Sequence, residues 1–184
     1  MGGMTPAPQD PTLAPWRSLQ EHLAGYLAAR ARGFLASEFV LSSRDGEVLG
    51  RLRVHGPQGA DVEARDITAA IERGAGSRYR MLDGDGRVIL EETTGSGDAS
   101  EVRCGDRIYE VRLALLRNAA VARSSGGGEV ARVAGGLTNR SYDALFDAGE
   151  EGALPLAVFL LYRIIALRRR AFLTDAGRGE ASSP

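Results

Sequence analysis

The sequence predicts a mainly β fold with helices, an antiparallel β-barrel enclosing a hydrophobic C-terminal helix and preceded by an amphipathic helix. Three observations lead there. Short apolar runs separated by turn signals fill the chain from residue 39 to about residue 134. Residues 153–173 read ALPLAVFLLYRIIALRRRAFL and are apolar on almost every face. The chain has 184 residues, 43% of them hydrophobic, which suits one folded domain with a sizeable core.

The two ends of the chain differ in composition from the middle. Residues 1–15 contain four of the seven prolines, so we expect a flexible tail there. Residues 175–184 are rich in Gly, Ala, Ser and charge, and we expect a second flexible tail. The folded domain is therefore expected over residues 16–174.

Residues 16–35 are expected to form the first helix. Apolar side chains recur there at spacings of three and four, which is typical of one helical face, and Gly33 is a suitable stop. Such a helix either packs on the domain or serves as a surface for a partner or membrane. The apolar residues of this face are Trp16, Leu19, Leu23, Tyr26 and Leu27.

The middle of the chain has the pattern of short strands. Short apolar runs stand on both sides of Asp45-Gly46 and Asp85-Gly86, and apolar and charged residues alternate toward residue 54. Asp-Gly between two such runs is a strong hairpin signal. A looser repeat surrounds residues 126–128. We expect ten to twelve antiparallel strands in a sandwich or barrel. The expected strand segments are residues 39–41, 47–54, 60–68, 79–82, 88–90, 101–104, 108–116, 119–121 and 130–133.

The helix expected over residues 153–173 decides between two architectures. Pro155 suits a first helical turn, and acidic residues before the helix and arginines at its end complement the helix dipole. A helix that is apolar all round is buried either in protein or in lipid. Arg163 interrupts the apolar run, and about 20 mostly apolar residues are needed to span a bilayer. A barrel of ten to twelve strands is too wide for side chains alone, and this helix would fill it.

The order of hairpins and helix resembles the tubby C-terminal-like superfamily, which includes the LURP-one-related proteins and the phospholipid scramblases. The resemblance covers roughly residues 36–173 and lies in FVLSSRDGEVLGRLRV, YRMLDGDGRVILEE, RIYEVRLALL and LPLAVFLLYRIIAL. It implies a barrel of about twelve strands around the last helix. It also implies a non-enzymatic binding role, with phosphoinositides or other lipids as ligands in some members.

Composition excludes several classes of chemistry. All 23 basic residues are arginine, so the chain has no lysine for a Schiff base or a phosphate-binding P-loop. One cysteine and two distant histidines give no metal-ligand pattern, and we expect no metal and no cofactor. The net charge of −1 does not suit a nucleic-acid binder, so no nucleic-acid partner is expected. The absence of a secretory pattern at residues 1–15 leads us to expect a cytoplasmic protein with at most peripheral membrane association.

Four arginines are the candidate binding residues. Arg163 in a central helix needs a partner, either a strand carboxylate or a bound anion. The cluster Arg168, Arg169 and Arg170 either complements the helix dipole or binds phosphate or anionic lipid headgroups. No catalytic residue is assigned.

We therefore expect a non-enzymatic binding module for an anionic lipid or a protein partner, and not an integral membrane protein. The alternatives are a membrane-associated protein anchored by residues 153–173 and an enzyme without a recognisable motif. The oligomeric state does not follow from the sequence.

Overall fold

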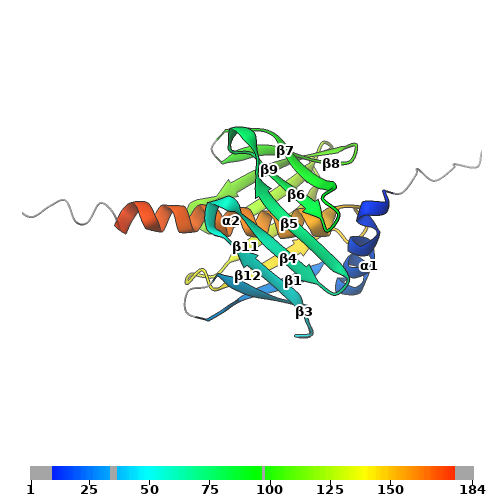
Figure 1. Ribbon diagram of the computed structural model, residues 1–184, viewed down its shortest axis with the longest axis horizontal. Coiled ribbons are helices and arrows are strands. Elements are labelled where there is room, and N and C mark those ends of the chain that lie inside the picture. The colour runs from blue at the N-terminus through cyan, green and yellow to red at the C-terminus, as the bar shows by residue number, and fades with distance from the viewer. Residues whose placement is uncertain (1–9, 34–36, 97, 177–184) are drawn as a thin grey trace, which may run out of the picture.

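Twelve antiparallel strands form one closed barrel with a helix running through it. The computed structural model describes residues 10–33, 37–96 and 98–176. Each strand pairs with its neighbours in the sequence, and β1 pairs with β12 to close the barrel. Helix α2 lies along the barrel axis and leaves at one end, while α1 lies at the other end (Figure 1). The predicted fold class, a twelve-stranded barrel around a hydrophobic C-terminal helix, is confirmed.

The element bounds fix the layout of the barrel. The strands are β1 (Tyr26–Arg32), β2 (Glu38–Ser42), β3 (Val48–Val54), β4 (Gly59–Ala64), β5 (Ile67–Arg73), β6 (Tyr79–Asp83), β7 (Val88–Ser96), β8 (Ala99–Cys104), β9 (Arg107–Ala114), β10 (Ala119–Ser124), β11 (Glu129–Gly135) and β12 (Ser141–Phe146). The helices are α1 (Ala14–Leu23) and α2 (Ala153–Ala176), with short 3-10 turns η1 (Pro11–Leu13), η2 (Gly56–Gln58), η3 (Ala75–Ser77) and η4 (Leu115–Arg117).

Small side chains on the strands make room for α2. An α-helix with its side chains is about 10–12 Å across, so many of the strand side chains that face it have to be small. Eight alanines of the strands are at most 4% exposed, and larger buried residues of the strands stand between them. These alanines are Ala29, Ala60, Ala64, Ala69, Ala120, Ala122, Ala131 and Ala144.

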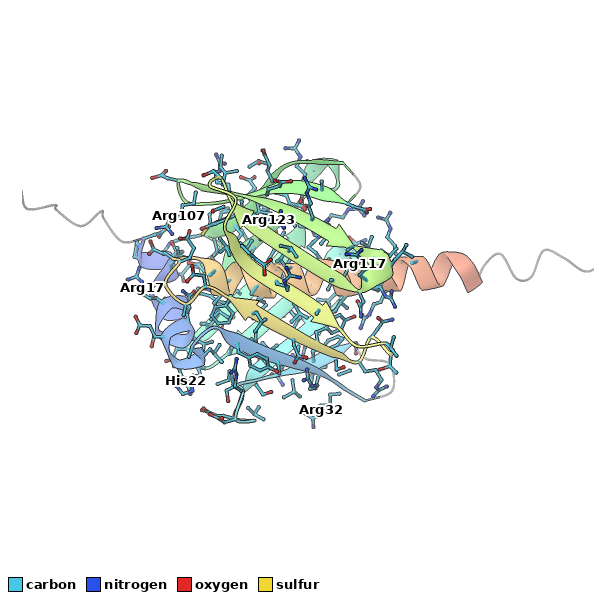
Figure 2. The ribbon with its side chains drawn as sticks, turned by 180° about the vertical axis from the view of Figure 1, so that it is seen from behind. Arg17, His22, Arg32, Arg107, Arg117 and Arg123 are labelled. Atoms are coloured by element: carbon cyan, nitrogen blue, oxygen red, sulfur yellow. The ribbon has the colours of Figure 1, made fainter. Side chains whose placement is uncertain are left out.

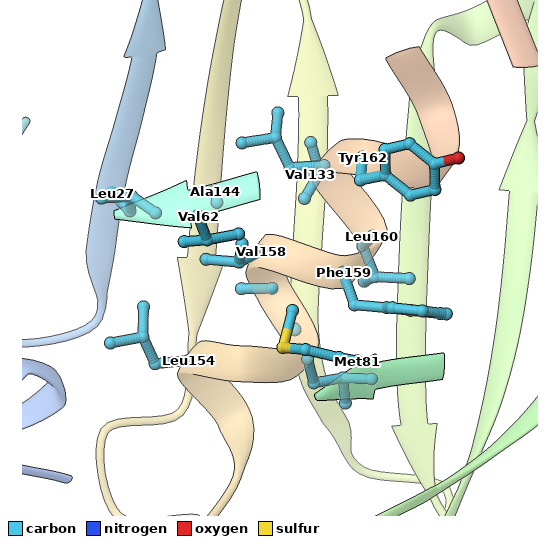
Figure 3. Packing of buried hydrophobic residues seen from close by; sticks show 14 of the residues in the cluster. Leu27, Val62, Met81, Val133, Ala144, Leu154, Val158, Phe159, Leu160 and Tyr162 are labelled. Carbon is cyan, nitrogen blue, oxygen red and sulfur yellow. The ribbon is translucent and has the colours of Figure 1, made fainter. Parts of the chain in front are cut away.

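Helix α2 is the centre of the hydrophobic core. All residues from Ala153 to Ala166 are buried except Arg163, which is partly buried. Figure 3 shows Val158 and Phe159 between Val62, Met81 and other strand side chains that approach from different parts of the wall. With 24 residues, α2 is about 36 Å long at 1.5 Å per residue, longer than strands of about 20 Å, so its C-terminal turns project beyond the barrel. No helix in the described part of the chain is both long and apolar enough to cross a membrane.

Helix α1 covers the end of the barrel at which α2 begins, which we call the capped end. Trp16, Leu19 and Leu23 are buried there. The buried amide of Gln20 accepts a hydrogen bond from the backbone N–H of Leu154 at 3.0 Å. The same amide donates to the carbonyls of residues 148 and 150. Gln20 thus satisfies the N–H of Leu154, which has no partner within the helix, and ties the loop before α2 to α1. The opposite end, where α2 emerges, is the exit end.

The helix predicted over residues 16–35 is wrong beyond Leu23. Ala24 has a left-handed φ of 47° and ends α1, and Gly25 follows with φ 88°. A Cβ at Gly25 would lie 2.8 Å from the carbonyl oxygen of Phe146, so the chain turns sharply there into a strand. Tyr26 and Leu27, expected on the helical face, lie on β1.

The predicted strand segments are largely confirmed, with two differences. Residues 60–68, expected as one strand, belong to β4 and β5, which are joined by a turn at Arg65, where φ is 48°. Strands β1 and β12 were not predicted. They pair with each other across the whole length of the sequence, and local alternation is weak in both.

The expected flexible tails differ from the structure where it describes them. Residues 10–15 are folded, because the side chain of Asp10 accepts a hydrogen bond from the N–H of Thr12 and Leu13 is buried. Helix α2 was predicted over residues 153–173 and continues to Ala176, so residues 175 and 176 are helical rather than a tail. The rest of the two predicted tails, residues 1–9 and 177–184, lies outside the described residues.

Candidate anion-binding site at the exit end

A cavity of about 330 Å³ opens at the exit end between α2, the η2 turn and strands β5 to β9. Helix α2 contributes Arg163, Ala166, Leu167 and Arg170, whose spacing of three, four and seven places them on one helical face. The other charged or polar residues of the lining are Arg73, Arg78, Glu92, Asp98 and Ser100, which come from the strands and their loops.

The floor of the cavity is a buried ion pair. The guanidinium of Arg163 contacts the carboxylate of Glu92, and these side chains are 16% and 5% exposed. The second carboxylate oxygen of Glu92 accepts a hydrogen bond from the backbone N–H of Tyr79 at 2.9 Å. The guanidinium also lies over the Tyr79 ring, 4.6 Å from its centroid. Glu92 is thus held by two donors, and Arg163 by a charge and an aromatic face.

Burial lowers the pKa of Arg163, and the nearby Tyr79 hydroxyl opposes this shift. Arginine remains protonated in proteins even when its pKa falls, because its ordinary pKa is about 12.5 or higher. Arg163 therefore keeps its positive charge at the floor of the cavity and neutralises Glu92.

The mouth of the cavity is positively charged. Arg73 and Arg78 flank the turn that contains η3, and Arg170 faces them from α2. Arg78 donates to the carbonyl of Thr93 at 2.9 Å, which fixes its guanidinium beside the opening. Because Glu92 is matched by Arg163, Asp98 is the remaining carboxylate in the described lining to oppose these three arginines. The lining thus carries an excess of positive charge.

Ser100 adds a polar group to the wall. Its hydroxyl is buried and has no hydrogen-bond partner among the described residues. A serine hydroxyl both donates and accepts, so it can donate to an anion that the arginines hold. Arginine itself presents donors in a planar fork that matches phosphate or carboxylate oxygens.

The structure divides the four predicted arginines into two groups. Arg163 and Arg170 line the cavity together, whereas Arg168 and Arg169 do not. Arg168 lies about 140° around the helix from Arg163, at 100° per residue. It donates to Asn139 Oδ1 at 3.0 Å and to the carbonyl of Leu115 at 2.9 Å, so it ties two loops to α2. Arg169 is partly buried, and this burial lowers its pKa.

Sequence reasoning missed the strand side of the cavity. Arg73, Arg78, Glu92 and Ser100 lie on four different strands or their loops, and strand pairing alone brings them together. The one local signal is a Gly-Ala-Gly-Ser turn between two arginine-bearing strand ends, residues 73–78. Such a turn places both arginines at the same edge of the sheet.

Of the remaining candidates for chemistry, Cys104 and His22 lie toward the capped end, whereas His55 lies at the exit end, two residues before Pro57 of the cavity lining. Cys104 is buried near the capped end, and burial raises its pKa to about 12. His22 pairs with Glu47 and His55 with Asp61, each at 2.8 Å and exposed. In the described part of the chain, no three His, Cys, Asp or Glu residues are grouped so that they could hold a metal ion.

Comparison with known proteins supports the fold alone. No protein-family model matches the sequence, and no curated protein matches it. A solved X-ray structure of a protein from Arabidopsis thaliana is similar, with a TM-score of 0.52 and 12% sequence identity over 75% of this chain and 89% of the other. At this identity the similarity concerns the arrangement of strands and helix, not a ligand or an activity.

Proposed function

We propose that the protein is a non-enzymatic binding module that holds an oxyanion, above all a phosphate group, in the exit-end cavity. One observation carries the proposal. Arg73, Arg78 and Arg170 surround an opening whose floor is already neutralised by the Arg163–Glu92 pair. Arginines held apart in this way attract an anion, and a phosphate can accept from several of them at once.

The resemblance to the tubby C-terminal-like superfamily supports a binding role rather than catalysis. A chain of twelve antiparallel strands closed around its last helix has the element order expected for that superfamily.

Two sources of the phosphate fit the cavity, a free phosphorylated molecule and a lipid headgroup. Thermal melting of the full chain in inorganic phosphate, with chloride at equal ionic strength as reference, tests the shared chemistry. Phosphate that binds the native state raises the melting temperature as its concentration passes Kd. Short-chain phosphatidic acid below its micelle concentration distinguishes the sources, since tighter binding than that of glycerol phosphate means that the acyl chains are also recognised.

A matched pair of variants makes the test specific. The Arg73→Gln/Arg170→Gln variant should weaken phosphate binding by about tenfold or more, because each lost charge-assisted hydrogen bond is worth about 1.5 kcal/mol. The control, Arg112→Gln/Arg123→Gln, removes two exposed arginines from β9 and β10 and should bind as the unmodified chain does. Phosphate that stabilises the chain no more than chloride does, or equally in both variants, would overturn the proposal.

A further inference from the structure

The lining of the exit-end cavity is rich in hydrogen-bond donors and poor in acceptors. Its arginines can only donate. The side-chain carboxylates of the described lining are those of Glu92 and Asp98. Both oxygens of Glu92 are engaged, one by the guanidinium of Arg163 and the other by the backbone N–H of Tyr79. Asp98 is therefore the carboxylate that remains to accept a hydrogen bond from a ligand.

The neighbouring strands hold Asp98 in place. It lies in the turn between β7 and β8, and its backbone carbonyl accepts a hydrogen bond from the N–H of Leu113 on β9 at 2.7 Å. Asp98 is exposed, and no residue of the described chain donates a hydrogen bond to its carboxylate. Ser100 follows two positions later and lines the same cavity, with a hydroxyl that has no partner among the described residues. An acceptor and a donor therefore face the cavity from one strand end.

The charge of the lining suits a doubly charged anion. The ion pair at the floor is neutral. The three arginines of the mouth, together with Asp98, leave the lining with an excess of two positive charges. Phosphate and sulfate are both tetrahedral oxyanions that can carry two negative charges. Arginine donors alone do not distinguish the two, because both anions offer oxygens that accept.

A single proton distinguishes these two anions. At mildly alkaline pH, hydrogen phosphate has one O–H group, whereas every oxygen of sulfate can only accept. A carboxylate can accept a hydrogen bond from the O–H of hydrogen phosphate. The same carboxylate repels sulfate, because two acceptors of like charge then face each other. Such a repulsive contact with the wrong ligand is a source of specificity.

We infer that Asp98 makes the cavity selective for a tetrahedral oxyanion that carries a proton, so that hydrogen phosphate is favoured over sulfate. The inference rests on the proposed phosphate site and specifies which oxyanion that site takes. The arginines of the mouth hold the unprotonated oxygens, Ser100 donates to one of them, and Asp98 accepts from the O–H. A phosphate monoester binds in the form that keeps its proton. A phosphodiester, which has no such proton, is rejected.

Titration calorimetry of the full chain with four anions tests the selectivity. At mildly alkaline pH and constant ionic strength, hydrogen phosphate and hydrogen arsenate carry two charges and a proton, whereas sulfate and selenate carry two charges and no proton. Phosphate and arsenate should bind with similar affinity. Sulfate and selenate should bind about tenfold more weakly, as expected when one hydrogen bond to a charged group is lost.

The Asp98→Asn variant keeps the size of the side chain and removes its charge. Its amide can donate to an unprotonated oxygen as well as accept from an O–H. Sulfate affinity should therefore rise about tenfold, whereas phosphate affinity should stay within about threefold of that of the unmodified chain. The backbone carbonyl that Leu113 binds is retained in this variant, and melting curves check that it is folded.

The matched control is Asp106→Asn, which removes an exposed acid from the turn between β8 and β9. Asp106 is next to Arg107 in the sequence, and Figure 2 shows Arg107 at the capped end, away from the cavity. This variant should bind phosphate and sulfate as the unmodified chain does.

Methyl phosphate and dimethyl phosphate test the same preference at a single negative charge. At mildly acidic pH, below the second pKa of a phosphate monoester at about 6, both carry one charge and methyl phosphate alone keeps a proton. Methyl phosphate should bind about tenfold more tightly than dimethyl phosphate. This comparison also separates the sources of the phosphate, since most lipid headgroups are joined through a diester.

The possible outcomes separate the site from its selectivity. If none of the anions binds, the proposed phosphate site is overturned and the selectivity with it. If sulfate binds as tightly as phosphate, or dimethyl phosphate as tightly as methyl phosphate, the site stands and the selectivity is overturned. If Asp98→Asn prefers phosphate as strongly as the unmodified chain does, the assignment of the selectivity to Asp98 is wrong.

Discussion

Glu92 on β7 and Arg163 on α2 form an ion pair between the wall of the barrel and the helix inside it. Neither side chain is more than 16% exposed. The pair ties α2 to β7. Tyr162 donates to the carbonyl of Gly56 at 3.2 Å and Arg168 ties α2 to two further loops, so these polar contacts and the close-packed apolar side chains together fix the rotation of the helix.

Replacing one member of this pair should be more harmful than replacing both. Arg163→Leu leaves the Glu92 carboxylate buried without its counter-charge and should cost about 3–5 kcal/mol in the free energy of unfolding. Arg163→Leu/Glu92→Gln should recover most of that loss, because a neutral amide oxygen still accepts from the N–H of Tyr79. Urea denaturation of the two single variants and the double variant measures the coupling free energy. Additive losses would show that the two side chains do not interact.

The core depends on α2. Phe159 is fully buried, so Phe159→Ala should cost about 3–5 kcal/mol by leaving a cavity at the centre of the barrel. Removing residues 153–184 should abolish cooperative unfolding, because the inward alanines of the strands cannot fill the space themselves. Circular dichroism melts check both expectations. A truncated chain that melted cooperatively would mean that the strands form a stable barrel without the helix.

Strands β3 and β4 approach each other closely at Gly50. A Cβ there would lie 1.9 Å from the carbonyl oxygen of Glu63 and 2.6 Å from the Cα of Ala64. Gly50→Ala therefore forces the two backbones apart and should cost about 3 kcal/mol. Gly74→Ala is the matched control, because its nearest neighbour would be at 3.6 Å and its φ is −90°. Chemical denaturation should show the control within about 1 kcal/mol of the unmodified chain.

A buried thiol and three buried tyrosine hydroxyls make the stability of the native state sensitive to alkaline pH. Burial raises the pKa of Cys104 from 9.0 to about 12 and raises the pKa of Tyr109, Tyr142 and Tyr162 above 10.0. A raised pKa means that the native state keeps a proton that the unfolded chain releases. The stability from Cys104 is therefore complete below pH 9 and is lost as pH rises toward about 12.

Absorbance at 295 nm and circular dichroism, followed together in an alkaline titration, check this expectation. The phenolate signal of the three buried tyrosines should rise together with the loss of native ellipticity. Tyrosines that ionised near pH 10.0 in a chain with a native spectrum would contradict it. Neutral-pH alkylation gives a second check, because the Cys104 thiol should react only when the chain is unfolded.

The features that could be predicted from the sequence are those with a local signal. Asp45-Gly46 and Asp85-Gly86 indicate hairpins because a tight turn needs particular residues. Residues 153–173 indicate a buried helix because they are apolar on almost every face. The junction at Ala24 and Gly25 was missed because spacings of three and four continue by chance from α1 into β1. Strand β12 pairs with a partner far away in the sequence, so nothing nearby indicates it.

The candidate site was predictable on one side only. Arg163 is conspicuous in an apolar helix, and Arg170 belongs to an obvious cluster. Nothing in the sequence around Glu92 or Ser100 distinguishes them from exposed strand residues. Only the pairing of strands far apart in the fold places them beside α2. Because the residues that line this cavity come from separate strands, their spacing in the sequence does not indicate that they lie together.

The position of α2 in the chain has a consequence for biosynthesis. Translation is vectorial, so all twelve strands leave the ribosome before the helix that they must enclose. During that interval the apolar faces of the strands are exposed to water. The edge of β1 has no pairing partner until β12 has been synthesised. The closed barrel with its helix inside can therefore form only after all twelve strands and α2 have been synthesised.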